Sequence, residues 1–400
     1  MSSRSGVGFC EHPDARLAAR TAARDALAGG GLQRCDLALV FGTARHDPEE
    51  LLAGVREVIG AEPRLIGGAT GGVITNDRLG YDGAQVGVAL LQADHARFDT
   101  FSEPSLDRGE REAGRALATQ IRSRDYHSEP SLLLFYDSVR RPIAEGLVLN
   151  QATPLLEGMS GVFGTWPSAA GVGMISDSRM GWGFGLFGDR VERQSALALA
   201  VSGGLRMDTA ILHGCKPASG YHTITRATGS IVEEIDGRPA LDLVEELVGP
   251  HLGWKEFPLF VTLGVNRGDK FGEFREDDYA NRLCMAVDPE RRALIMFEPD
   301  LATGADVQLM RRSIDLDYIR PQVEALLARA AGRRPVFAFY IDCIGRASGN
   351  GGGEREEAEE VQRAFGDIPL LGVYSGVEMA KVGGSMTALD WTGVLCLFSE

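Results

Sequence analysis

The stretch PVFAFYIDCIGR, residues 335–346, decides the fold together with the residues that follow it. Its first seven residues are all apolar, which is typical of a strand buried on both faces. After it come an acidic helical pattern (354–366, EREEAEEVQRAFG), a strand with a turn (368–379, IPLLGVYSGVEM) and a closing strand (392–399, TGVLCLFS). A helix-length link lets the first two strands run parallel through a right-handed crossover, and the third can pair antiparallel.

The same order of elements occurs twice earlier in the chain. The middle copy comprises a strand at 131–138, a helix at 141–158, a strand with Gly-rich turns at 159–173 and a strand at 195–204. The first copy comprises a strand at 36–44, a helix at 48–60, a strand with a Gly-rich turn at 64–75 and a strand at 85–92. The pattern predicts an α/β fold of layered mixed β-sheets covered by helices, built from repeated strand–helix–strand–strand units. Its length favours two domains, which we place at 14–205 and 206–400.

Composition narrows the class of protein. The 400 residues carry a net charge of −15, which argues against binding to nucleic acid or to an anionic membrane surface. The N-terminal residues lack the apolar core of a signal peptide, and no apolar run is long enough to span a membrane. The six cysteines are scattered and form no CxxC pair, which favours a reducing compartment. We therefore expect a cytoplasmic protein with no membrane and no nucleic-acid partner.

Polar side chains follow the two strands of the C-terminal copy. Cys343 and Arg346 come where the first strand ends, and Tyr374 and Glu378 come at the corresponding end of the next. Ligands of open α/β sheets bind at such strand ends, so the four side chains form our candidate ligand pocket. Arg346 fits a bidentate contact with a carboxylate, although pairing with Asp342 or Glu378 is an equal alternative. Asp390, in the turn before the last strand, lies near this expected pocket.

A second group of candidates lies in HGCKP, residues 213–217. His213 and Cys215 would point the same way from an extended segment, and both residue types bind metal or haem iron. Lys216 lies beside them as a further ligand-binding candidate, and His222 follows in a β-like run. A structural role is the alternative for each of these residues. If haem binds, His213 and His222 are the proximal candidates, and the sequence does not choose between them.

Glycine-rich and acidic segments have plainer interpretations. GGATGG at 67–72 lacks the lysine of a P-loop and the spacing of a dinucleotide site, so a tight turn is favoured over an anion cradle. The acidic run within 354–362 is typical of a solvated helix face. GMSGV at 158–162 lacks the last glycine of a nucleophile elbow. We expect a protein that is not an enzyme, with a thiol-dependent enzyme using Cys343 as an alternative.

The order of these motifs resembles the FIST family, which has an N-terminal and a C-terminal FIST domain. The resemblance rests on DPEELL and RLIGGATGG in the first half, HGCKP and DGRPAL (236–241) in the centre, and IDCIGR, LLGVYSGVEMAKVGG and ALDWTGVLCLF towards the end. It covers residues from about Asp36 to Phe398.

The resemblance implies a sensory protein of bacterial signal transduction that binds a small ligand, such as an amino acid. It implies a separate output partner, such as a histidine kinase. Some FIST proteins bind haem and sense nitric oxide, so a haem-based sensor is the alternative function, and haem is a possible cofactor.

Overall fold

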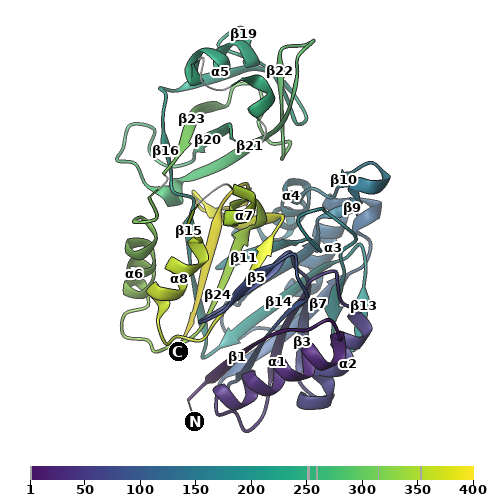
Figure 1. Cartoon of the computed structure of the whole chain (residues 1–400). Coiled ribbons are helices and arrows are strands. Elements are labelled where there is room, and N and C mark those ends of the chain that lie inside the picture. The colour runs from purple at the N-terminus through teal and green to yellow at the C-terminus, as the bar shows by residue number, and fades with distance from the viewer. Residues whose placement is uncertain (1, 250–252, 258–259, 314, 352–353) are drawn as a thin grey trace.

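The computed structural model describes residues 2–249, 253–257, 260–313, 315–351 and 354–400. They form a body of three similar units with an insert above it (Figure 1). The chain termini lie together at the far end of the body, where the backbone N–H of Ser3 donates to the carboxylate of Glu400 at 2.9 Å.

Each unit of the body has the same order of elements. The first contains β1 (Arg4–Glu11), α1 (Ala15–Gly29), β2 (Leu37–Gly42), α2 (Pro48–Ile59), β3 (Arg64–Ala69), β4 (Gly72–Thr75), β5 (Leu79–Tyr81) and β6 (Gln85–Gln92). The second contains β7 (Ala96–Glu103), α3 (Glu110–Arg122), β8 (Ser131–Asp137), α4 (Ala152–Phe163), β11 (Ala169–Met174), β12 (Gly185–Phe187), β13 (Arg190–Glu192) and β14 (Ala196–Gly203). The third contains β15 (Arg206–Leu212), α6 (Ile319–Arg329), β24 (Pro335–Cys343), α8 (Glu357–Phe365), β25 (Leu370–Ser375), β26 (Val377–Val382), β27 (Ser385–Leu389) and β28 (Gly393–Ser399). The predicted repeat and the α/β class are confirmed, whereas the division into two domains at 205/206 stays a prediction.

Strand pairing follows the expected rule in all three units. β2 runs parallel to β3, β8 to β11 and β24 to β25, because a helix connects the two strands of each pair. The closing strands β6, β14 and β28 pair antiparallel with β2, β8 and β24. The C-terminal ends of β24 and β25 therefore lie next to each other at the same end of the sheet.

The units also exchange hairpins. β4–β5 of the first unit joins the sheet of the third, β12–β13 of the second joins that of the first, and β26–β27 of the third joins that of the second. Each sheet thus has six strands, four from the unit itself, counting its leading strand, and two from another unit. The exchange closes into a ring, so no unit completes its own sheet.

Helices cover the outer faces of the three sheets, while their inner faces share one core (Figure 1). At its centre the ring of Phe41 lies 5.8 Å from that of Phe135 and 5.7 Å from that of Phe339. These three phenylalanines come from β2, β8 and β24, so equivalent strands of the three units meet there. Burial of such rings is the main stabilising contribution.

The insert interrupts the third unit between β15 and α6. Its described elements are β16 (Cys215–Pro217), β17 (His222–Thr228), β18 (Ile231–Ile235), β19 (Arg238–Pro239), α5 (Ala240–Val248), β20 (Thr262–Asn266), β21 (Tyr279–Asp288), β22 (Ala293–Met296) and β23 (Asp306–Arg312). The strands form one further antiparallel sheet. None of the described helices is long and apolar enough to cross a membrane.

The predicted helix at 141–158 is wrong over its first half. Residues 139–141 and 148–149 form the short strands β9 and β10, and the helix α4 begins only at Ala152. Pro142 and Gly146 oppose a helix there, since proline removes a backbone donor and glycine costs conformational entropy. The helix then continues to Phe163, through residues expected to form a strand, and ends at Gly164 with φ of +68°.

The GGATGG segment is buried; it contains the end of β3 and the connection that leads to β4 in the sheet of the third unit. Gly67 and Gly68 belong to β3, where φ is +151° and +155°, and a Cβ on Gly67 would lie 1.9 Å from the carbonyl oxygen of Val40. The N–H of Gly71 donates to the carbonyl of Tyr374 at 3.0 Å as the chain crosses to the third unit's sheet. The segment therefore needs glycine for close packing of strands, and this N–H is engaged within the protein.

Candidate functional site

The ends of β24 and β25 carry the candidate residues on two faces of the sheet. Asp342 pairs in register with Tyr374, and Cys343 pairs with Ser375. Because side chains alternate along a strand, Tyr340, Asp342 and Tyr374 face the helix layer, whereas Cys343 and Ser375 face the opposite side. The predicted residues thus gather at one sheet edge without sharing one face.

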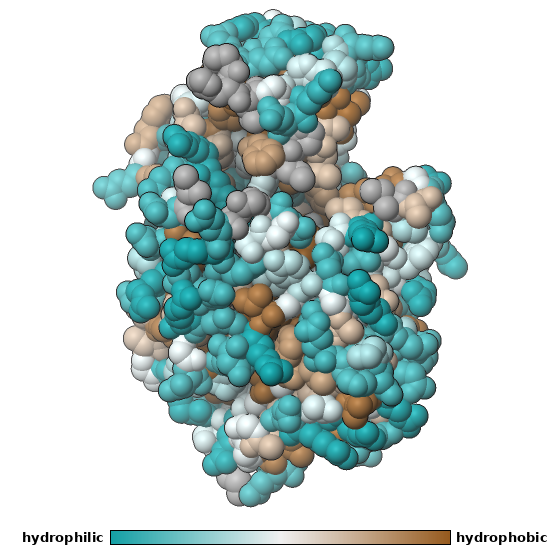
Figure 2. Space-filling view, viewed as in Figure 1, coloured by the Kyte–Doolittle hydropathy of each residue, from teal (hydrophilic) through white to brown (hydrophobic). Residues whose placement is uncertain are grey.

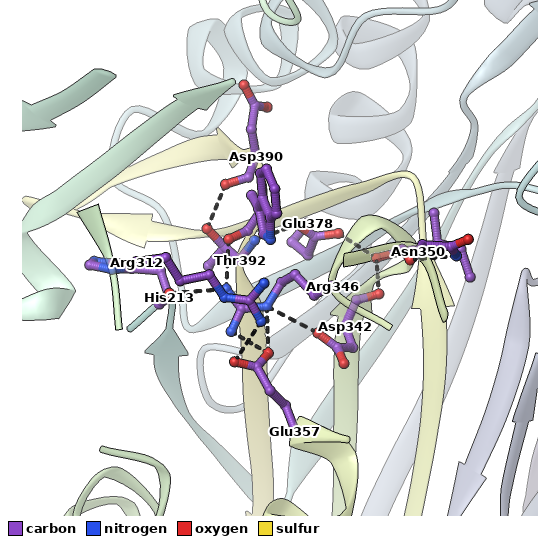
Figure 3. Close-up of polar contacts among 12 residues, drawn as sticks. His213, Arg312, Asp342, Arg346, Asn350, Glu357, Glu378, Asp390 and Thr392 are labelled. Carbon is purple, nitrogen blue, oxygen red and sulfur yellow. Dashed lines mark hydrogen bonds and ion pairs between the residues drawn. The ribbon is translucent and has the colours of Figure 1, made fainter. Parts of the chain in front are cut away.

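Arg346 lies at the centre of a buried ion network (Figure 3). Its side chain has no exposed surface, and its Nε and Nη2 contact Glu357 Oε2 at 2.8 and 2.5 Å. Nη1 donates to the carbonyls of His213 and Trp391 at 3.0 and 2.8 Å, and Nη2 donates to the hydroxyl of Tyr318 at 2.9 Å. These contacts use all five N–H donors of a guanidinium. As it stands, Arg346 positions its neighbours and has no donor left for a ligand carboxylate.

Glu357 corrects the expectation of a solvated acidic face. Its carboxylate is 2% exposed and contacts Arg312 of β23 at 3.0 Å as well as Arg346. The Tyr318 hydroxyl also donates to it. The two guanidinium groups lower the pKa of Glu357 against the opposing effect of burial. Arg312 belongs to the insert and Glu357 to the body, so this carboxylate ties the two together.

Three oxygens on the helix face make no hydrogen bond within the described part of the chain: Asp342 Oδ1, the Tyr340 hydroxyl and the Tyr374 hydroxyl. Asp342 Oδ1 lies 3.5 Å from Arg346 Nε, too far for a strong bond. Burial raises the pKa of Asp342 to about 7; Arg346 opposes this effect, Glu357 reinforces it, and the nearby Tyr340 hydroxyl opposes it. Asp342 is the largest electrostatic influence on both tyrosines. Buried polar atoms without partners are rare in folded proteins, so these three oxygens need a physical explanation.

Tyr81 closes the side of this face next to Tyr374. The two rings meet edge to face with centroids 5.4 Å apart. The Tyr81 hydroxyl donates to Glu356 Oε1 at 2.9 Å and accepts from the N–H of Gly349 at 3.0 Å. Tyr81 belongs to β5, so the hairpin exchanged from the first unit forms one wall of the candidate site.

Cys343 and Glu378 lie on the inner face. Burial and then the charge of Glu378 raise the pKa of the Cys343 thiol well above its usual value. Burial likewise raises the pKa of Glu378 well above its usual range, although Ser375 Oγ donates to it at 2.6 Å and the N–H of Thr392 at 3.2 Å. A thiolate nucleophile needs a lowered pKa and access to substrate. Cys343 is buried with a raised pKa in this structure, so no contact among the described residues activates its thiol, and the thiol-enzyme alternative stays a prediction.

The HGCKP residues take structural positions where the insert begins. His213 is fully buried; its Nδ1 accepts from the N–H of Cys215 at 2.9 Å and its Nε2 lies 3.3 Å from the carbonyl of Glu276. Burial, then Arg346, lower the pKa of His213 to about 3. Burial raises the pKa of Cys215 to about 11, and Lys216 is exposed. Both His213 nitrogens are engaged, so the ring has no lone pair directed at a haem iron.

His222 lies apart from His213, on β17 of the insert. Its Nδ1 contacts Asp236 Oδ2 at 2.7 Å, and its side chain is 19% exposed. Within the described ranges, no three His, Cys, Asp or Glu side chains come together as a metal site. No contact in the structure selects His222 for haem.

Asp390 and Trp391 hold the insert against the body. Asp390 Oδ2 accepts from the N–H of Leu283 in β21 at 2.9 Å, and burial raises its pKa to about 7. The Arg312 guanidinium lies 5.6 Å from the centre of the Trp391 ring, and Trp391 itself has φ of +51°. Asp390 is thus placed at the junction of insert and body.

Sequence reasoning missed four residues of this site: Tyr318, Tyr340, Glu357 and Arg312. Tyr340 and Asp342 alternate along β24, so the spacing of two could have placed them on one face. Nothing in the acidic run distinguishes Glu357 from its exposed neighbours.

Comparison with known proteins identifies both halves of the chain. Residues 36–238 match the FIST N domain and residues 240–381 match the FIST C domain. An uncharacterized protein of Mycobacterium tuberculosis is 29% identical over 99% of this chain and 100% of its own length. One of Mycobacterium bovis is 28% identical over 99% of both chains, and one of Methanocaldococcus jannaschii is 21% identical over 80% of this chain and 62% of its own.

Two solved structures of cyanuric acid hydrolases also resemble the chain. One has a TM-score of 0.35 at 8% identity over the full length of both chains. The other, from A. caulinodans, has a TM-score of 0.29 at 10% identity over 50% of this chain and 71% of its own. Because these structures are enzymes, the expectation that the chain is not an enzyme is withdrawn. The scores are too low to carry any activity over to this chain.

The two domain matches together extend from residue 36 to residue 381. The chain therefore belongs to the FIST family, whose domains are small-ligand-binding sensory domains of signalling proteins.

Proposed function

We propose that the chain is a sensory protein of cytoplasmic signal transduction that binds the ammonium group of a small amine or amino acid between Tyr340, Asp342 and Tyr374. One observation carries the proposal: three buried oxygens on adjacent positions of β24 and β25 have no hydrogen-bond partner among the described residues. An ammonium group supplies three donors, which matches one carboxylate and two phenolic oxygens.

The charges around this face favour a cation. Asp342 and Glu357 both lie against Arg346, and Glu357 takes most of its contacts. Arg346 is saturated, so Asp342 keeps an incompletely paired carboxylate. A bound ammonium would favour ionised Asp342 over its protonated form. If the ligand is an amino acid, its carboxylate must bind elsewhere than on Arg346.

The position of the site supports transmission of a signal to the insert. Asp342 contacts Arg346, which holds the carbonyl of His213 at the start of the insert. Glu357 connects the same arginine to Arg312 at the end of the insert. Ligand binding at Asp342 would alter the balance of this network and hence the two connections of the insert. A separate output protein, such as a histidine kinase, would read that change.

A thermal-shift screen tests the proposal. The panel consists of amino acids, their amides and simple amines at pH 8, with the matching N-acetylated compounds as controls. An amine at about a hundred times its dissociation constant stabilises the folded state by about 2.7 kcal/mol. We expect at least one amine to raise the melting temperature, and its N-acetyl form to fail.

Two variants locate the response. Tyr374→Phe removes one of the three oxygens while keeping the ring against Tyr81, and Asp342→Asn removes the charge. Both should abolish or strongly weaken the shift. Tyr126→Phe, a tyrosine of the second unit away from this face, is the control. A panel without any shift, or a shift unchanged in both site variants, would refute the proposal.

A further inference from the structure

A cavity of about 350 Å³ lies on another part of the junction between insert and body. Its walls come from the insert, from the first turns of α4 and from the hairpin β26–β27. The lining residues are Thr153, Leu156, Glu157, Ser160, Arg267, Asp300, Val382, Gly383, Ser385, Met386, Thr387 and Ala388. Figure 2 shows the molecular surface hollowed between the insert and the body, with apolar residues among those bordering it. Small-molecule sites commonly occupy interfaces between domains and have volumes of this order.

The charges lining the cavity are unequally paired. Glu157 contacts Arg111, and Asp300 is held by the fully buried Arg282 through two contacts. Arg267 is exposed and makes no side-chain hydrogen bond or ion pair with the residues that the structure describes, although its charge, after that of Arg282, helps to lower the pKa of Asp300 against the effect of burial. Both acids are thus in direct contact with other arginines, so the Arg267 guanidinium keeps its N–H donors available for a ligand even though Asp300 is near it. Such a group binds a carboxylate or phosphate with two parallel hydrogen bonds.

The backbone of Arg267 is fixed beside the cavity. Gly383, at the turn of β26–β27, has φ of +57°, and a Cβ there would lie 2.7 Å from the Cβ of Arg267. The Arg267 N–H donates to the carbonyl of Asp278 at 2.8 Å. Only glycine allows this close approach without strain, and it holds the base of the arginine side chain in place.

The remaining lining residues indicate which chemical groups the rest of a ligand would carry. The lining includes four buried apolar residues, Leu156, Val382, Met386 and Ala388. Hydroxyls of Thr153, Ser385 and Thr387 stand among them. A molecule with one anionic end and a short hydrocarbon chain would satisfy both parts of the lining.

We infer that this cavity is a second ligand site, distinct from the amine site at Asp342, and that it takes a small organic carboxylate whose anionic group pairs with Arg267. Its occupant would contact both the insert and the body. The cavity lining contains none of Tyr340, Asp342 and Tyr374, and the two sites would accept opposite charges, so the inference does not depend on the proposed amine site.

Binding of sodium acetate, butyrate and hexanoate to the full chain tests this inference, with inorganic phosphate as the non-carboxylate anion. Melting temperature and isothermal calorimetry are the two readouts. We expect butyrate or hexanoate to bind better than acetate. At about ten times the dissociation constant the melting temperature should rise by about 2 °C. Phosphate binding as well as the carboxylates would overturn the assignment, as would the absence of binding by all three carboxylates.

Three variants locate the binding. Arg267→Gln should weaken carboxylate binding about tenfold to a hundredfold, since a charge-assisted hydrogen bond contributes about 1.5–3 kcal/mol. Ser385→Trp, at an exposed position on the rim, should block the cavity without disturbing the core. Arg275→Gln is the matched control, because Arg275 is an exposed arginine of the same insert outside the lining. Carboxylate binding that is retained in both Arg267→Gln and Ser385→Trp would overturn the inference. Binding of methylammonium to Arg267→Gln is measured separately and tests the amine site alone.

Discussion

Replacing Arg346 with methionine tests the arrangement of the site. The change keeps most of the side-chain volume and removes the charge. Removing one partner of a buried ion pair costs about 3–5 kcal/mol, because the remaining charge stays buried without compensation. Here Glu357 keeps Arg312, whereas Asp342 loses the guanidinium beside it. We expect a loss in this range.

The loss converts into a measurable temperature shift. Unfolding entropy is about 2.1 cal/mol/K per residue, so a cooperative unfolding of 400 residues gives about 0.8 kcal/mol/K. The melting temperature of Arg346→Met should therefore fall by about 4–6 °C in differential scanning calorimetry at pH 8. The deficit should shrink at pH 5, because protonation of Asp342 removes the uncompensated charge.

Arg355→Met is the matched control. Arg355 is an arginine nine residues along the chain, 60% exposed, in an ion pair with Glu360. Exposed pairs contribute about 0–1 kcal/mol, which corresponds to a shift of about 1 °C or less. If the melting temperature of Arg346→Met falls no further than that of this control, the buried ion network does not hold the site together. The same conclusion follows if the decrease is equal at pH 5 and pH 8.

Three further predictions concern single residues elsewhere in the fold. Burial raises the pKa of Asp137 to about 7, so folding takes up a proton between about pH 4 and 7, and the free energy of unfolding falls as pH rises through that window. The stability of Asp137→Asn relative to the wild type should therefore increase across the window, by at most about 4 kcal/mol in urea titrations. Parallel plots of unfolding free energy against pH for the two proteins would contradict this. Cys343→Ser should leave ligand-induced stabilisation in place. Cys343 in the native chain should react with iodoacetamide far more slowly than the partly exposed Cys10. Rapid labelling of Cys343 in a peptide map would contradict this. Gly67→Ala should greatly lower the yield of soluble folded protein, because its Cβ would overlap the Val40 carbonyl. Gly29→Ala has open space around the new Cβ and should be tolerated. Equal yields of the two variants would show that β2 and β3 do not pack as described.

The repeated units could be predicted from the sequence because their strands are long apolar runs and a helix-length link separates each parallel pair. The exchanged hairpins could not. Strands such as Leu79–Tyr81 and Gly185–Phe187 have three residues each, too few for periodicity, and their partners lie in another unit. Strand exchange is a tertiary property that local patterns do not encode.

The sequence predicts that the candidate residues lie near one another, but it does not predict their contacts. The strand-end rule selected Cys343, Arg346, Tyr374 and Glu378, and named Asp342 only as an alternative partner of Arg346. The register places Asp342 beside Tyr374. The burial of Glu357 depends on Arg346 and Arg312, which approach it from distant parts of the chain. An acidic run contains no signal for such a contact, because charge alone favours solvent.

Proton release on ligand binding tests the central claim most directly. The amine found in the screen is titrated calorimetrically at pH 6 in buffers of different ionisation enthalpy, using the wild type and Asp342→Asn. Because the pKa of Asp342 is about 7 in the protein, an ammonium group that pairs with it should displace its proton. The account predicts release of close to one proton per ligand in the wild type and none in Asp342→Asn, with weaker binding. Binding without proton release, at the same affinity in both proteins, would contradict it.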